Sequence, residues 1–317
     1  MTAPPPVLTF GETMGLATST RPGSFMMDSA LELGIGGSET NVAIGLARLG
    51  VETTWVSRLG DDGLGRLILR EMHAEQIDAK VVIDGTAPTG FMLKERRTRA
   101  RSAVTYYRSG SAASKLSAED LPRELLMGRS LLHLTGITPA LSPSAREATL
   151  HAARTARDLQ VPVSFDVNYR SRLWGPETAA PVFAELVALS SVVFAGADEA
   201  RLLFPGLEEP LPLARALIDA GATDAVIKLG DAGCVAVIDG REYVVPAVRV
   251  DAVDTVGAGD AFVAGYLSQL VRGADPQERL ARAVLTGALA CLVPGDWEGA
   301  PREDELDAFE HAESVLR

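Results

Sequence analysis

The feature that most restricts the fold of this chain is an alternation of short apolar runs with longer segments of helical period. It is clearest over residues 130–238, where runs such as Ser130–Leu134 and Ala225–Leu229 alternate with segments such as Ala145–Leu159 and Leu213–Ala220. Strands that are connected through helices pair in parallel, and the helices cover both faces of their sheet. The sequence therefore predicts an α/β fold built on a doubly wound, mostly parallel sheet.

Two β-rich segments, near residues 14–37 and 86–110, interrupt this alternation. The second contains two β-like runs, Gly90–Lys94 and Ala103–Tyr107, on either side of a basic stretch from Arg96 to Arg101. This pattern is typical of a hairpin with an exposed tip. We predict that the two segments come together as a small, separate sheet.

Charge and composition exclude several classes of protein. A net charge of −12 argues against a nucleic-acid partner, which needs a basic face. No apolar stretch is long enough to cross a membrane, and the first residues have no secretory pattern, so we expect a cytoplasmic protein without membrane contacts. The spacing of the cysteines and histidines fits no zinc site, and we expect both cysteines, Cys234 and Cys291, to be small buried hydrophobic residues.

The strongest local signal is the segment Asp254-Thr-Val-Gly-Ala-Gly-Asp260, which precedes a helical pattern. Gly257, Ala258 and Gly259 would then lie at a helix N-terminus, where free N–H groups attract an anion such as phosphate. Asp260 has the chemistry to accept a proton from an attacking hydroxyl. A plain strand–helix turn with Asp260 as a cap explains the spacing about equally well. The segment matches neither a Walker loop nor a dinucleotide fingerprint.

A second signal is Val163-Ser-Phe-Asp-Val-Asn-Tyr-Arg170, in which apolar and polar residues alternate. In an extended strand, the side chains of Asp166 and Asn168 would lie on one face, with Arg170 at the carboxyl end, where open α/β sheets bind ligands. These three residues are candidates for binding a substrate or a phosphate. The alternative is a partly exposed strand end.

Two further segments are candidates for substrate binding. Arg108 with Tyr106 is a suitable pair for an anionic, hydroxylated ligand, because a guanidinium matches a carboxylate. Gly36 and Gly37 permit a close approach, and Asn41 has an amide for sugar hydroxyls. A hairpin arm with a solvated arginine, and a loop with a helix cap, are the respective alternatives.

Two further patterns predict a helix start and a nucleotide-binding loop. Ser38 is predicted to be the N-cap of the helix that follows, with Glu39 as a favourable first-turn anion. Lys228, Gly230 and Gly233 follow a predicted strand and are candidates for a loop against a nucleotide. On its own, this last pattern is also that of an ordinary loop.

Taken in order along the chain, these segments resemble the ribokinase-like (PfkB) family of carbohydrate kinases. The Gly36-Gly37…Asn41 and Asp254–Asp260 segments are similar to the N-terminal and C-terminal signatures of that family. The resemblance implies a single kinase domain over residues 1–317, with a small β-sheet lid from about 14–37 and 86–110. It also implies ATP, Mg²⁺ and transfer to a sugar hydroxyl, with a monovalent cation as a further candidate cofactor. The exposed edge of such a lid predicts a homo-oligomer.

Within the family, four segments resemble 2-keto-3-deoxygluconate kinases: Tyr106-Tyr107-Arg108-x-Gly-Ser-Ala, His133–Pro143, Asp166–Trp174 and Gly295–Pro301. This resemblance implies ATP-dependent formation of the 6-phosphate with Asp260 as general base. The sugar acid would be surrounded by Gly37, Asn41, Tyr106, Arg108, Arg170 and Asp260. Kinases of the same fold for 2-keto-3-deoxygalactonate, fructose or 5-keto-2-deoxygluconate, and a non-catalytic sugar sensor, are the alternatives.

The chain departs from the family pattern at three positions. Phe91 stands where these kinases often carry a substrate-facing tyrosine, and Val284 where an asparagine often lines the adenine pocket. Gly196 replaces the asparagine of an Asn-x-x-Glu motif for metal and phosphate, while Glu199 keeps the acidic member, as an indirect metal contact.

Overall fold

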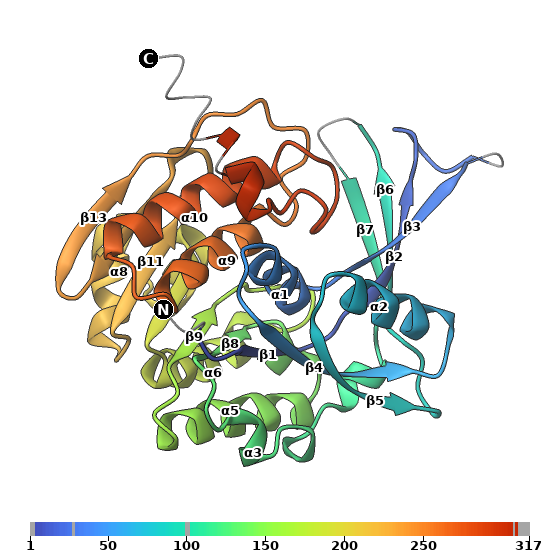
Figure 1. Ribbon diagram of the computed structural model, residues 1–317, viewed down its shortest axis with the longest axis horizontal. Helices are drawn as coiled ribbons and strands as arrows, with labels where there is room; N and C mark the ends of the chain where they lie inside the picture. Colours follow the sequence, from blue (N-terminus) through green and yellow to red (C-terminus); the bar gives the residue numbers. More distant parts are fainter. Residues whose placement is uncertain (1–3, 27–28, 99–101, 307, 310–317) are drawn as a thin grey trace.

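The computed structural model describes residues 4–26, 29–98, 102–306 and 308–309. Within them, the larger sheet has the strand order β13-β12-β11-β10-β9-β8-β1-β4-β5 (Figure 1). Its neighbours pair in parallel except at β11–β12 and β12–β13, which confirms the predicted mostly parallel sheet. The strands are β1 (Val7–Phe10), β4 (Thr53–Gly60), β5 (Asp78–Asp84), β8 (Leu131–Thr135), β9 (Val163–Asp166), β10 (Val192–Gly196), β11 (Asp224–Lys228), β12 (Cys234–Ile238) and β13 (Arg241–Val245).

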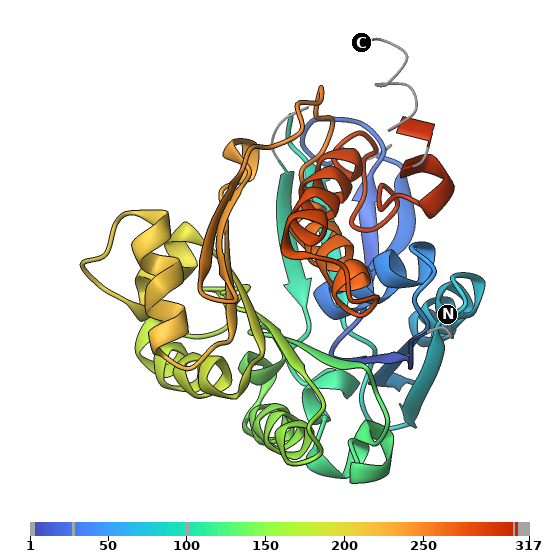
Figure 2. The ribbon, with the colours of Figure 1, turned by 60° about the vertical axis from the view of Figure 1, so that its left-hand side comes forward.

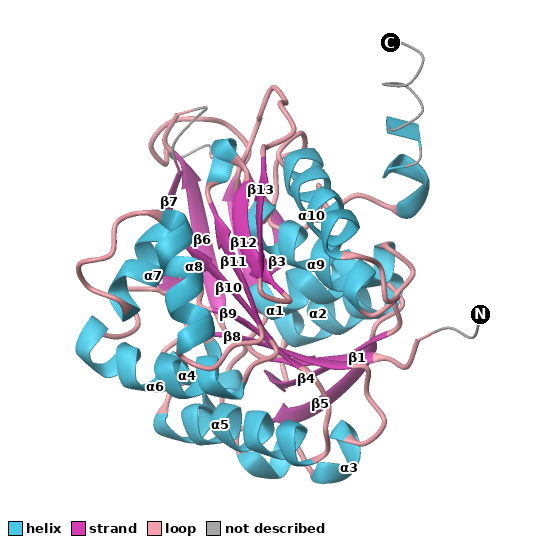
Figure 3. Cartoon of the chain, turned by 90° about the vertical axis from the view of Figure 1, so that its left-hand side faces the viewer, coloured by secondary structure: helices cyan, strands magenta, loops and turns pink. Residues whose placement is uncertain are grey.

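Helices cover both faces of this sheet, as Figures 2 and 3 show from two sides. One hydrophobic core joins the sheet to α5–α8, and a second joins it to α1, α9 and α10. The helices are α1 (Ser38–Arg48), α2 (Gly63–Ala74), α3 (Arg123–Leu126), α4 (Thr138–Leu141), α5 (Pro143–Asp158), α6 (Pro176–Leu189), α7 (Ala197–Leu203), α8 (Pro210–Asp219), α9 (Ala258–Leu270) and α10 (Pro276–Ala290). Among the described residues, no helix combines the length and apolar character that a membrane crossing requires.

Successive residues of the buried strands point into opposite cores. In β10, Val193 belongs to the core with α5–α8, and Phe194 belongs to the core with α9 and α10. The ring of Phe194 meets that of Tyr266 from α9 edge-on, with 5.1 Å between the centroids. A strand buried on both faces is apolar at nearly every position, which is why β10 appears as a continuous apolar run. Cys234 and Cys291 are both free and buried, as expected.

The two β-rich segments form a separate four-stranded sheet with the order β3-β2-β6-β7. Its strands are β2 (Met14–Ser19), β3 (Leu31–Gly36), β6 (Phe91–Arg96) and β7 (Ser102–Tyr107). Parallel pairing of β2 with β6 joins the two segments, and the antiparallel pair β6–β7 is the predicted hairpin, which confirms the small separate sheet. Residues 99–101 of the predicted tip lie outside the described residues.

The chain order of the strands reverses between β1 and β8. From β1 the sheet runs through β4 and β5 in one direction and through β8, β9, β10 and β11 in the other. Open α/β sheets bind ligands at such a point, outside the carboxyl ends of their strands. The small sheet starts at the same place, because β2 begins four residues after β1 ends. This edge is therefore where a site is expected.

Candidate active site

Asp260 lies in the first turn of α9 and is held by two residues of α1. Its Oδ1 atom accepts a hydrogen bond of 2.7 Å from the Ser38 hydroxyl, and its Oδ2 atom accepts one of 2.8 Å from the Asn41 amide. The prediction that Ser38 caps α1 is wrong, because Gly37 is the N-cap and makes no side-chain cap. The Ser38 hydroxyl is instead aimed across the site. Two donors thus fix the orientation of the Asp260 carboxylate.

Asn168 supports this arrangement from behind. Its amide donates a hydrogen bond of 2.7 Å to the Ser38 hydroxyl, which completes a chain from Asn168 through Ser38 to Asp260. The predicted strand alternation fails here, because β9 ends at Asp166 and Asn168 has a φ of +36°. Asn168 is buried and in contact with Ser38, so the structure places it behind Asp260 and not in the open part of the site.

The surroundings make Asp260 a stronger base. Burial raises the pKa of the Asp260 carboxyl, and the hydrogen bonds from Ser38 and Asn41 and the charges of Lys228 and Arg170 lower it by less. The pKa therefore lies above the usual aspartate value. A carboxylate with a raised pKa takes a proton from a hydroxyl more readily, provided that it is ionised at the working pH.

The glycine-rich turn ahead of Asp260 is shaped for close approach to an anion. Gly257 is the N-cap of α9, with a left-handed φ of +76°. A Cβ atom on Gly257 would lie only 1.9 Å from the carbonyl oxygen of Asp296, so no larger residue fits. The N–H groups of the first helical turn have no partner within the helix, although that of Ala258 donates a hydrogen bond of 3.3 Å to the preceding Thr255 carbonyl oxygen. The positive end of the helix dipole adds to their attraction for phosphate.

A lysine whose side chain is 18% exposed lies beside this turn. The Nζ atom of Lys228, at the end of β11, is 3.8 Å from the position that a Cβ atom on Gly259 would take. It donates to both oxygens of Asp166, at 2.8 and 2.7 Å. Burial alone would lower the pKa of Lys228, but the carboxylates of Asp166, Glu199 and Asp260 hold it above the usual value. Lys228 is therefore a fixed cation next to the glycine-rich turn.

Asp166 was a candidate for direct contact with substrate, but in the structure its carboxylate is buried against Lys228. Its side chain is 1% exposed and both of its oxygens bind Lys228. Asp166 therefore acts on the site through the lysine, which it orients and neutralises in part.

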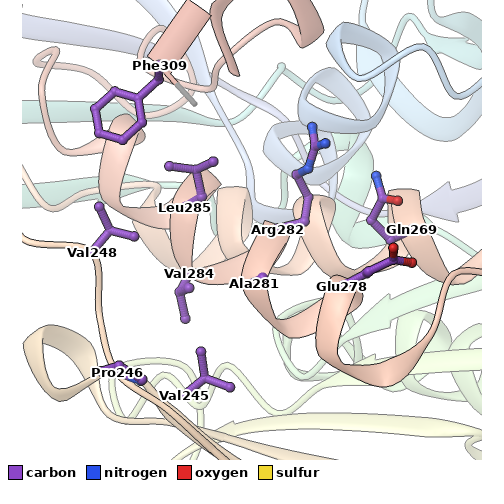
Figure 4. A pocket seen from close by; sticks show the side chains of 10 residues that line it. All are labelled: Val245, Pro246, Val248, Gln269, Glu278, Ala281, Arg282, Val284, Leu285 and Phe309. Atoms are coloured by element: carbon purple, nitrogen blue, oxygen red, sulfur yellow. The ribbon is translucent and has the colours of Figure 1, made fainter. Parts of the chain in front are cut away.

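A cavity of about 880 Å³ opens next to the turn. Its lining includes five of the predicted nucleotide residues, namely Lys228, Gly230, Gly233, Gly259 and Val284. A second cavity, of about 500 Å³, adjoins it, since Val248 and Val284 line both (Figure 4). Val284 thus lies on α10 between two largely apolar spaces. The larger cavity has the size of a nucleotide site and ends at the glycine-rich turn, where Thr255, Ala258 and Gly259 line it.

Arg108 is held by Glu12, a residue that the sequence analysis did not identify. Its guanidinium binds the buried carboxylate of Glu12, with 2.6 Å from Nε to Oε2, and lies 5.8 Å from the ring centre of Tyr106. Glu12 also accepts a short hydrogen bond from the Ser111 hydroxyl. Because a guanidinium has five donors, one edge remains for a ligand. The available signal for Glu12 was its place directly after the first strand, at the topological switch point.

The small sheet divides the remaining candidates between its two faces. Met92 is the register partner of Tyr106, and its Cε atom lies 2.5 Å from where a Cβ atom on Gly36 would be. Phe91 pairs with Tyr107 on the opposite face, so the structure does not bring Phe91 together with Tyr106. Met92, one position along, is the residue of β6 that lies on the same face as Tyr106.

The side chain of Arg170 is open to a ligand, whereas that of Glu199 is engaged by the backbone. Arg170 is exposed, and no described side chain pairs with its guanidinium. Both oxygens of Glu199 accept backbone hydrogen bonds, from the N–H groups of Tyr169 and Gly196. Among the described residues, no three or more histidine, cysteine, aspartate or glutamate side chains form a metal cluster.

Comparison with known proteins identifies the family. The model of the pfkB family carbohydrate kinases matches residues 6–302. The chain is 37% identical over 314 residues to the 2-dehydro-3-deoxygluconokinase of Bacillus subtilis (strain 168), covering 98% of this chain and 96% of that protein. It is 32% identical to the 2-dehydro-3-deoxygalactonokinase of Haloferax volcanii, with 92% of each chain covered.

A solved structure agrees with these matches. The crystal structure of the PfkB protein from Polaromonas sp. JS666 superimposes with a TM-score of 0.88 at 37% identity, and covers 96% of this chain and 99% of that one. The match of the family model, over residues 6–302, includes both sheets and the residues around Asp260. The chain is a member of the pfkB family of carbohydrate kinases.

Proposed function

We propose that this chain transfers the γ-phosphoryl group of ATP to the 6-hydroxyl of 2-dehydro-3-deoxygluconate, which is also called 2-keto-3-deoxygluconate. The observation that carries the proposal is the Asp260 carboxylate, oriented by Ser38 and Asn41 at the start of α9. The relative from Bacillus subtilis, matched over nearly the whole chain, supports the choice of sugar.

In the proposed reaction, the carboxylate of Asp260 takes the proton of the sugar hydroxyl. The hydroxyl oxygen bonds to the γ-phosphorus while the bond from that phosphorus to the bridging oxygen breaks, and ADP leaves with the electron pair. The N–H groups of Gly257, Ala258 and Gly259 and the ammonium of Lys228 stabilise the charge on the transferring group. The small sheet acts as a lid, which keeps water from competing as the acceptor.

The residues present fit a magnesium ion that is bound with the nucleotide. Mg²⁺ in kinase sites is held by substrate phosphates and one or two carboxylates, not by a cage of protein ligands. Glu199 is the proposed indirect contact, since each of its oxygens accepts one backbone N–H group and keeps a second lone pair for a metal-bound water. When bound, Mg²⁺ neutralises charge on the phosphates. The requirement for a monovalent cation stays a prediction, which turnover in potassium compared with choline tests.

The sugar acid is proposed to bind through two cations. Arg170 is exposed, and Arg108 presents the guanidinium edge that Glu12 does not use. Both suit a carboxylate, whereas a neutral sugar such as fructose does not need them. An ADP-release assay with 2-dehydro-3-deoxygluconate, 2-dehydro-3-deoxygalactonate, 5-dehydro-2-deoxygluconate and fructose tests this choice. Equal rates on fructose would refute the sugar-acid assignment, and no turnover with any acceptor would favour a sugar sensor.

The variant Arg108→Lys tests the carboxylate contact separately. It keeps a cation beside Glu12 but loses the planar fork, so we expect KM for the sugar acid to rise roughly 10-fold or more while kcat/KM for fructose stays the same. The control is Arg154→Lys, in an exposed pair with Glu185. An equal effect on acidic and neutral acceptors would show that Arg108 does not bind the carboxylate.

We further propose that two or more copies associate through the small sheet. Its edge strand β3 exposes Leu31 and Leu33, at 50% and 57%. Light scattering should then give a multiple of the 33.5 kDa chain mass, and Leu33→Asp should give the single mass. Val244→Asp, on the edge strand β13 of the larger sheet, is the matched control and should leave the assembly intact. A single-chain mass for the wild type would contradict the proposal.

A further inference from the structure

One buried cation of the small sheet has no part in the mechanism described so far. Lys94, on β6, is only 4% exposed. Its Nζ atom lies 3.1 Å from Oδ2 of Asp254 and 3.7 Å from Oδ1 of Asp296. Both carboxylates belong to loops outside the small sheet, and these loops are far from β6 in the chain. Lys94 is therefore a contact between the small sheet and two loops beside the anion-binding turn.

Each of the two loops borders that turn. The Oδ1 atom of Asp254 accepts a hydrogen bond of 3.2 Å from the N–H group of Val256, one residue before Gly257. The backbone of Asp296 packs directly on Gly257, since its carbonyl oxygen lies 1.9 Å from where a Cβ atom would be. Lys94 therefore contacts both segments that border the turn: Asp254, at the start of the turn, and Asp296, whose backbone packs on Gly257.

Burying a charged lysine destabilises the folded state unless carboxylates pair with its ammonium group. Removing an ammonium from water carries a penalty of several kcal/mol, which carboxylate partners must offset. Burial raises the pKa of Asp296 to about 6, and Lys94 opposes that rise. The small sheet also has an apolar core of its own, made by Met14, Leu16 and Met92, so its strands do not depend on the lysine for packing.

We propose that Lys94 is a positioning residue for phosphoryl transfer, which holds the loops of Asp254 and Asp296 so that the Gly257–Gly259 turn keeps its anion-binding shape. The inference rests on the proposed kinase reaction and adds that the placement of the small sheet and the shape of the turn are coupled. Lys94 touches neither the base nor its donors, Ser38 and Asn41. Its effect should therefore fall on kcat and not on the binding of the sugar.

The first test compares Lys94→Met and Lys94→Arg with the wild type in the ADP-release assay. We expect Lys94→Met to lower kcat by roughly 10- to 100-fold, because a displacement of reacting groups by about 1 Å has an effect of that size. KM for the sugar should stay within about threefold of the wild-type value. Lys94→Arg, which restores a cation between the carboxylates, should recover most of kcat. Lys115→Met is the matched control, because it breaks a lysine–aspartate pair of 3.0 Å to Asp84 away from the turn.

The double variant Lys94→Met/Asp296→Asn separates positioning from stability. It removes one of the two carboxylates left without a cation, so the melting temperature should recover while kcat stays low. If kcat recovers together with the melting temperature, Lys94 has only a structural role and the inference is wrong. It is equally wrong if Lys94→Met keeps kcat within twofold. If the wild type itself transfers no phosphoryl group to any acceptor, the proposed function fails instead.

Discussion

Asp260→Asn should lower kcat by about 10²- to 10⁴-fold, the range for the loss of a general base, and leave the affinity for the sugar almost unchanged. The amide has nearly the same shape as the carboxylate and can still meet the Ser38 hydroxyl through its oxygen. It cannot take a proton from the sugar hydroxyl. Single-turnover measurement of ADP release, with calorimetric binding of the sugar, separates the two quantities.

The control for this variant is Asp275→Asn. Asp275 also lies at a helix start, where its carboxylate caps α10 by accepting from the N–H group of Glu278. We expect it to change stability slightly and kcat not at all. A kcat for Asp260→Asn within about fivefold of the wild type would mean that another group removes the proton.

Gly257→Ala should have the second largest effect on turnover. The left-handed φ of +76° disfavours any side chain, and the added Cβ atom would collide with the Asp296 carbonyl oxygen at 1.9 Å. The turn must move, which withdraws at least one N–H donor from the transferring phosphoryl group. Loss of one such donor costs roughly 10²- to 10³-fold in kcat.

Gly63→Ala is the matched control for this substitution. Gly63 also opens a helix, α2, but a Cβ atom there would meet nothing within 4 Å. This variant should retain full turnover and at least the wild-type stability. Steady-state kinetics and thermal unfolding of both variants are sufficient. Turnover of Gly257→Ala above a tenth of the wild-type value would show that the turn does not hold the phosphoryl group.

The parts of this site that are contiguous in sequence could be predicted from it. Asp254–Asp260 carries its own turn, helix start and carboxylate, and the structure places Asp260 in the first turn of α9. Pairs that form across the fold could not be predicted. Asp166 meets Lys228 and Arg108 meets Glu12 over separations of 62 and 96 residues, and no local pattern links them.

Local patterns also failed where an element ended earlier than its period suggested. The alternation around Asp166 continues to Asn168 in the sequence, but β9 leaves the sheet at Asp166 and Asn168 turns toward α1. Ser38 has the usual chemistry of a helix cap, yet its hydroxyl serves a carboxylate 222 residues further along. In both cases a tertiary partner replaced the local one, which a single sequence does not disclose.

The parallel pairing of β2 with β6 has a consequence for synthesis on the ribosome. The register of the two strands runs from Gly15 opposite Phe91 to Thr18 opposite Lys94. This parallel pair cannot form until β3, α1, β4, α2 and β5, which lie between the two strands in the chain, have been synthesised. Asp260 and the loop of Asp296 emerge later still. Since nascent chains fold as they lengthen, we expect the small sheet to form before the chain can transfer any phosphoryl group.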